Sequence, residues 1–134
     1  MKFNVDKQEN VIVYEILEDK LTSANAPILK SELVLANTEG YNNIIIDLNN
    51  VRFVDSSGLS AILTADRLMK TNGSFVLTGI EQAAVKKLFE ISRLDSVLSM
   101  VPTKAEAVEY VFMEELQREL EADGDDGDEG DEDE

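Results

Sequence analysis

The chain has 134 residues, 43% of them hydrophobic, which suits a single domain with one buried core. It contains neither cysteine nor histidine, which excludes disulfides, thiol chemistry and any role for histidine as a base, metal ligand or phosphate carrier. The net charge of −16 is uneven, because residues 119–134 hold 11 acidic residues and no basic one. No apolar run approaches the ~20 residues of a membrane helix, and the N-terminus does not resemble a signal peptide. We therefore expect a cytoplasmic protein with no membrane insertion, no nucleic-acid partner, no metal and no other cofactor.

The first part of the chain predicts two strands and a helix. Short alternating apolar stretches at residues 3–6 and 11–17, separated by a polar turn, predict a hairpin. Residues 22–27 are typical of a helix entrance, with Pro27 in the first turn, where its missing N–H costs nothing. The helix is predicted to bury four residues at helical spacing: Ala26, Leu29, Leu33 and Ala36.

A second strand and helix follow. The unbroken isoleucines within residues 42–48 predict a central strand buried on both faces. Residues 59–69 predict an amphipathic helix, and its expected inward positions are Leu59, Ile62, Leu63 and Met69.

The rest of the chain continues this alternation. We predict a strand at 74–79, a helix at 81–91, an edge strand at 96–101 and a last helix opened by Pro102. Strands alternating with helices predict an α/β fold: a four- to five-stranded mixed sheet with helices packed mainly on one face. The acidic segment lacks the apolar residues that would offset its ordering entropy, which predicts a domain over 1–120 and a disordered acidic tail over 121–134.

The segment Asp55-Ser56-Ser57-Gly58 lies between the predicted central strand and its helix. A helix N-terminus offers free backbone N–H groups and the positive end of the dipole, so an added phosphate is stabilised there. Asp55 and Ser56 are also preferred N-cap residues, and on the residues alone capping is the favoured explanation. Both roles can coexist. Gly58 suggests close packing or a special backbone angle.

The residues from Asp47-Leu48 through Val54-Asp55-Ser56-Ser57-Gly58-Leu59 resemble the STAS domain (sulfate transporter and anti-sigma factor antagonist). A second matching element is Gly73-Ser74-Phe75-Val76-Leu77, followed by residues 84–91. Within the family, the chain is most similar to the small, free-standing bacterial anti-sigma factor antagonists, over roughly residues 3–116. The resemblance implies a STAS-like sheet and a protein-binding function.

In such antagonists the serine directly after the aspartate is phosphorylated by a serine kinase that doubles as the anti-sigma factor. The unphosphorylated antagonist binds this partner and frees the sigma factor, and a serine phosphatase resets the system. By position, the resemblance implies that Ser56 is the phosphoacceptor and that Asp55 positions its hydroxyl. Its neighbours in the partner-binding site would be Ser57, Gly58, Leu59 and Thr22. The chain departs from the family at Thr22, where an aspartate is common; Asp19 lies three residues earlier.

Two other classes of function stay open at this point. The domain could be a constitutive STAS scaffold subunit of a lipid-transport or stress-signalling complex, or it could bind a small molecule such as a nucleotide or lipid. We expect no enzyme activity, because a Ser56–Asp55 pair lacks a base between nucleophile and carboxylate. The acidic tail lacks the spacing of a calcium-binding loop, and we expect it to be a solvated solubility or autoinhibitory segment.

Overall fold

The computed structural model describes the backbone of residues 1–132 and the side chains of residues 1–122. Five strands form a mixed sheet in the order β1-β2-β4-β6-β7, in which only the β1–β2 pair is antiparallel. Their bounds are β1 Phe3–Lys7, β2 Ile12–Ile16, β4 Asn43–Asp47, β6 Ser74–Thr78 and β7 Ser99–Val101. The predicted hairpin and mixed sheet are therefore confirmed.

Two short strands were not predicted. Strand β3 (Lys20–Leu21) pairs in parallel with β5 (Phe53–Val54) to form a separate two-stranded sheet. Two residues are too few to show the alternation that marks a strand in a sequence. They are strands only because the fold brings two distant segments together.

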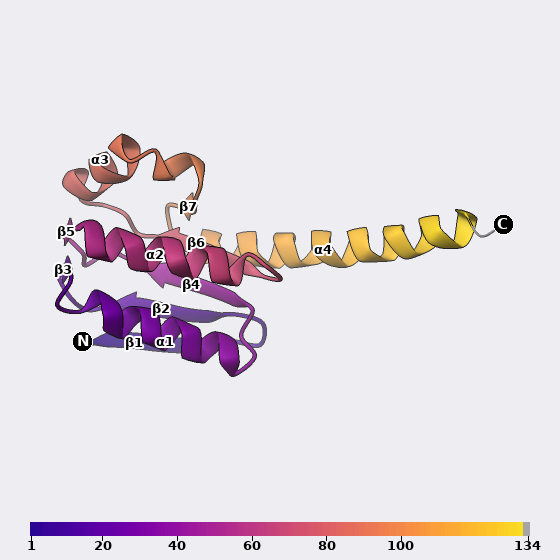
Figure 1. The fold of residues 1–134 in the computed structure, drawn as a ribbon, viewed down its shortest axis with the longest axis horizontal. Helices are drawn as coiled ribbons and strands as arrows, with labels where there is room; N and C mark the ends of the chain where they lie inside the picture. Colours follow the sequence, from indigo (N-terminus) through magenta and orange to yellow (C-terminus); the bar gives the residue numbers. More distant parts are fainter. Residues whose placement is uncertain (133–134) are drawn as a thin grey trace.

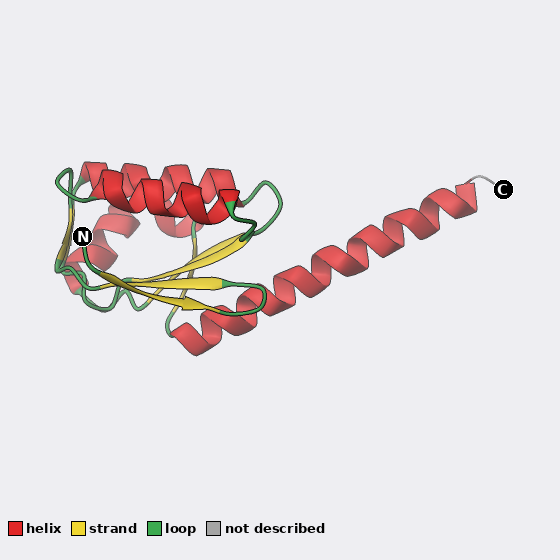
Figure 2. Ribbon diagram, turned by 90° about the horizontal axis from the view of Figure 1, so that it is seen from below, coloured by secondary structure: helices red, strands yellow, loops and turns green. Residues whose placement is uncertain are grey.

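Helices cover both faces of the sheet, but unequally. Their bounds are α1 Ala26–Thr38, α2 Ser56–Met69, α3 Ala83–Ile91 and α4 Lys104–Glu132, with a 3₁₀ turn at Leu94–Ser96. Helices α1 and α2 lie side by side on one face, whereas α4 crosses the other and extends well past the sheet (Figures 1 and 2). Because α3 contributes to the same core as α1 and α2, the expectation of helices mainly on one face holds.

The isoleucines of β4 show how the two faces are filled. Ile44 and Ile46 belong to the large core beneath α1 and α2, whereas Ile45 belongs to a smaller core beneath α4. Successive strand residues point to opposite faces, so an apolar residue is needed at every position when both faces are covered. All three side chains are fully buried.

The inward residues of α1 are those predicted, but α2 differs from its prediction. Ile62 and Met69 are buried, whereas Leu59 and Leu63 are only partly buried at the edge of the core. An acidic residue, Asp66, takes an inward position instead and is 4% exposed. Its burial is tolerated because the Lys70 ammonium forms an ion pair with it, 3.0 Å from Oδ1 of Asp66. The geometry of this contact is not that of a hydrogen bond, so Oδ1 of Asp66 has an ionic partner but no hydrogen-bond donor.

The acidic segment belongs to α4 in the structure as far as residue 132, and its expected disorder stays a prediction. The backbone over 121–132 continues α4 as helix, while 133–134 lie outside the described residues. Elongating an existing helix avoids the cost of nucleation, so a segment that would not begin a helix can prolong one. The division into a domain over 1–120 and an acidic tail stays a prediction.

Candidate functional site

Helices α1 and α2 begin at the same end of the molecule, next to the β3–β5 pair (Figure 1). Main-chain hydrogen bonds connect the segment before α1 to the segment before α2. The N–H of Asp55 donates to the carbonyl of Leu21 at 3.1 Å. The N–H of Arg52 donates to the carbonyl of Asp19 at 2.7 Å. We call this region the site end. It brings the loop before α1 against the start of α2.

Asp55 is the N-cap of α2 and connects the two loops. One carboxylate oxygen accepts a hydrogen bond from the N–H of Gly58 at 2.9 Å, as expected for a capping aspartate. The other oxygen accepts from the N–H of Ser23 at 3.2 Å. The carboxylate therefore caps its own helix and also holds the turn that leads into α1.

Ser56 is the first residue of α2, and its side chain is exposed. It opens onto a groove of about 450 Å³ between α1 and α2. Hydroxyl groups dominate the polar lining of this groove, and one ammonium group lies among them: Ser23, Lys30, Ser56, Ser57 and Ser60. A solvent-facing hydroxyl beside an open groove is reachable by a second protein.

Gly58 is buried, and the reason is steric. A Cβ atom at this position would lie 2.5 Å from the carbonyl oxygen of Leu21 and 2.8 Å from a methyl group of Val54. Only glycine lets the first turn of α2 approach β3 and β5 this closely. Leu59, next along the helix, is partly buried against the main core. Both residues thus set the position of Ser56 without being presented to solvent as Ser56 is.

Thr22, the remaining predicted site residue, makes hydrogen bonds to residues of its own turn. Its N–H donates to the Asn25 side chain at 2.9 Å, and its hydroxyl accepts from the N–H of Ala24 at 3.3 Å. The next residue, Ser23, contacts Asp55 and lines the groove. The structure therefore brings Asp55, Ser56 and Ser57 together with Ser23, while Thr22 shapes the loop behind them.

Three residues of the site end were missed by sequence reasoning. Ser23 and Lys30 line the groove from the α1 side, and Phe53 is an aromatic residue with 51% of its surface exposed. The turn sequence at 22–25 could have indicated Ser23. Nothing local indicates Phe53, because an aromatic residue two positions before the cap is expected to be buried.

The polar groups at the site end are hydrogen-bonding groups of the kind that contact another molecule. Asp55 is already engaged by two main-chain donors, and the groove presents hydroxyls and an ammonium group. Among the residues that the structure describes, no cluster of three or more acidic side chains could hold a metal ion. Within the same residues, no helix combines the length and apolar character needed to cross a bilayer.

Comparison with known proteins identifies the family. The STAS domain model matches residues 2–107, and the chain therefore belongs to the STAS domain family. The BtrV protein of Bordetella bronchiseptica, a candidate anti-sigma factor antagonist, is 29% identical over 108 residues, covering 80% of this chain and 91% of that protein.

Solved structures show the same fold. The crystal structure of a candidate anti-sigma factor antagonist from Thermotoga maritima has a TM-score of 0.73 at 25% identity, covering 81% of this chain and 93% of that one. The Bacillus cell fate determinant SpoIIAA, solved in its phosphorylated form, has a TM-score of 0.63 at 21% identity, covering 82% and 99%. At that identity the second likeness establishes the fold alone. The predicted STAS-like fold is confirmed.

Proposed function

We propose that the protein is an anti-sigma factor antagonist, a non-enzymatic binding module whose contact surface is the site end and whose switch residue is Ser56. The similarity to BtrV and to the Thermotoga protein supports a function as an anti-sigma factor antagonist. The observation that carries the switch is the exposed Ser56 hydroxyl at the first position of α2, beside an open groove. The partners are an anti-sigma factor with serine kinase activity and a serine phosphatase, acting in the cytoplasm.

A phosphate on Ser56 would be tolerated within this protein. It would add about −1.5 to −2 charges next to Asp55. The helix N-terminus returns roughly 0.3–1 kcal/mol to a nearby negative charge, and Asp55 is itself held by two main-chain donors. The fold therefore survives the modification.

The same phosphate would disrupt a contact with a partner. A protein that covers the groove must remove water from the dianion, and this penalty exceeds what the helix end returns. Exposed Phe53 and the groove hydroxyls supply the apolar and polar contacts that the unmodified surface offers. A phosphate on Ser56 that leaves the fold intact but prevents partner binding would act as a release switch.

The first test is fragment-ion mass spectrometry of the tryptic peptide covering residues 53–67, from native cells under growth and stress conditions. We expect a phosphate on Ser56. A peptide that is unmodified in every condition contradicts the switch and favours a constitutive scaffold subunit.

The second test measures binding to the anti-sigma factor encoded in the same cells. We expect Ser56→Asp to weaken binding at least about tenfold, or 1.4 kcal/mol, and Ser56→Ala to retain it. Ser92→Asp is the matched control, because it adds the same charge at an exposed serine after α3. Equal affinity of Ser56→Asp and the unaltered chain would show that the switch is assigned to the wrong residue.

A further inference from the structure

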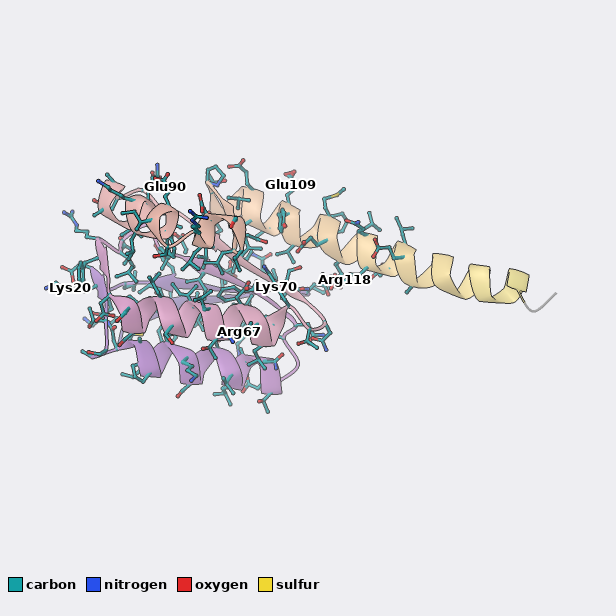
Figure 3. All side chains as sticks on the ribbon, turned by 45° about the horizontal axis from the view of Figure 1, so that its top comes forward. Lys20, Arg67, Lys70, Glu90, Glu109 and Arg118 are labelled. Atoms are coloured by element: carbon teal, nitrogen blue, oxygen red, sulfur yellow. The ribbon has the colours of Figure 1, made fainter. Side chains whose placement is uncertain are left out.

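Among the side chains of α4 that the structure describes, those on one side of the helix pack against the sheet. Ala107 and Val111 are buried in the smaller core. Further along, Arg118 donates to the Ser74 hydroxyl and to the Asn43 side chain, each at 3.1 Å. These contacts define the inner side of the helix, which packs against the sheet. Figure 3 shows Arg118 on this side and Glu109 on the side away from the sheet.

The opposite side of α4 carries a second apolar stripe. Leu116 lies nine residues, or about two and a half turns, after Ala107, which places it on the far side of the helix. Four residues form this outer stripe, and their exposed fractions are 58% for Phe112, 58% for Met113, 39% for Leu116 and 62% for Leu120. An amphipathic helix in a single domain needs one apolar face, so a second face indicates a second partner.

The charge of the chain around the outer stripe indicates which kind of partner can bind there. Residues 105–134 contain 15 acidic residues and a single basic one, a net of −14 out of the −16 of the whole chain. Residues 1–104 contain 13 acidic and 11 basic residues and are close to neutral. The outer stripe is therefore set within the most acidic part of the molecule. A second copy of this helix, a nucleic acid or an anionic membrane would each be repelled by that charge.

We propose that the outer stripe of α4 is a docking surface for a basic protein that receives the helix in an apolar groove. Leucine and phenylalanine side chains at helical spacing would fill the groove, and the flanking carboxylates would meet its basic rim. The arrangement is that of an amphipathic helix laid into a complementary cleft.

The position of α4 makes this surface separate from the site end. Ser56 lies where α2 begins, and α4 leaves the domain at the opposite end of the molecule (Figure 1). A protein bound at the groove between α1 and α2 leaves the projecting part of α4 free. The inference goes beyond the proposed switch and does not depend on phosphorylation of Ser56.

The test uses two fluorescent synthetic peptides as probes of the full chain. One is a helical leucine–lysine peptide with the leucines on one face, and the other replaces every leucine with serine at equal length and charge. We expect the leucine–lysine peptide to bind at least about tenfold more tightly. Met113→Ser combined with Leu120→Ser should abolish this preference. Ile91→Ser combined with Val97→Ser is the matched control and should retain it, since those side chains are also exposed, at 69% and 53%, but lie outside α4.

Two results overturn the proposal. Equal affinity of the two peptides for the unaltered chain would mean that the acidic segment attracts any polycation and that the stripe binds nothing. A dimer of the unaltered chain in light scattering, converted to a monomer by the α4 double variant, would make a second copy the occupant. Circular dichroism of each variant establishes that it is folded before binding is compared.

Discussion

The two ends of the molecule are built in contrasting ways. At the site end, hydrogen bonds between main-chain groups and the two-ended contact of Asp55 hold β3, β5 and the starts of α1 and α2 in one arrangement. At the other end, α4 is held by a few side chains around Arg118 and then leaves the domain, carrying an exposed apolar stripe and most of the negative charge. Figure 3 shows Lys20 at the first end and Arg118 near the second.

This difference teaches what each end is suited to do. A surface fixed by many short-range contacts presents a single hydroxyl in a defined position, which a kinase or a switch requires. A projecting helix has few contacts to lose, so its surface can adapt to a partner without cost to the fold. Substitutions of the residues that make these contacts, Asp55 and Gly58, should therefore lower the free energy of unfolding, whereas changes in the projecting part of α4 should hardly affect it.

The largest effect is expected from Gly58→Ala. The new methyl group would lie 2.5 Å from the carbonyl oxygen of Leu21, a main-chain atom that β3–β5 pairing holds in place. Overpacking of this kind costs about 1–3 kcal/mol, occasionally more, and it outweighs the gain of up to about 1 kcal/mol from replacing glycine in a helix. We expect the free energy of unfolding to fall by about 2 kcal/mol, measured by urea titration followed by circular dichroism.

Ser57→Ala serves as the control for that measurement. It changes the preceding residue of the same helical turn, which is only partly buried, and should alter stability by less than about 0.5 kcal/mol. A Gly58→Ala variant as stable as the unaltered chain would mean that α2 is not pressed against β3 and β5 as described.

A smaller effect is expected at Asp55. Asp55→Ala removes the cap of α2 and the acceptor of the Ser23 N–H together, and should cost about 1–2 kcal/mol. Asp55→Asn keeps one oxygen, and asparagine caps helices as well as aspartate does. Its amide nitrogen cannot accept from the N–H of Ser23, so only the turn before α1 should loosen.

Hydrogen exchange distinguishes the two Asp55 variants. In Asp55→Asn we expect faster exchange of the Ser23 amide with little change at the Gly58 amide, and in Asp55→Ala faster exchange at both. If the Ser23 amide exchanges equally fast in Asp55→Asn and the unaltered chain, the link between the two loops contributes nothing.

The sequence predicted the features that depend on local pattern. Helical spacing gave the buried residues of α1, and the position of Asp55 before a helix gave its capping role. What it could not give depends on distant parts of the chain meeting. The β3–β5 pair joins segments too short to show a period, and the contact of Asp55 with Ser23 spans 32 residues. Asp66 was missed because a carboxylate is expected outside. Its ion pair with Lys70 is a local contact four residues apart, but only the fold brings the Val97 carbonyl, to which the Lys70 ammonium donates at 2.9 Å, to the same place.

The smallest effect on stability is expected from removing residues 123–134. This part of α4 extends past the sheet, so its loss should change the free energy of unfolding by less than about 0.5 kcal/mol (Figure 2). The helical signal should change more, because the backbone over 123–132 is helical in the structure. Nine of the twelve removed residues are acidic, and like charges one turn apart oppose a helix unless salt screens them.

Far-UV circular dichroism of the full and truncated chains at rising salt concentration therefore tests how this end of the molecule is built. We expect the full chain to have the larger helical signal per molecule, and we expect the excess to grow with salt while the truncated chain stays constant. Equal signals at every salt concentration would instead match the disordered tail that the composition predicts. In that case α4 ends near residue 122, and the outer stripe, which runs from Phe112 to Leu120, forms its last turns and keeps its exposed side chains.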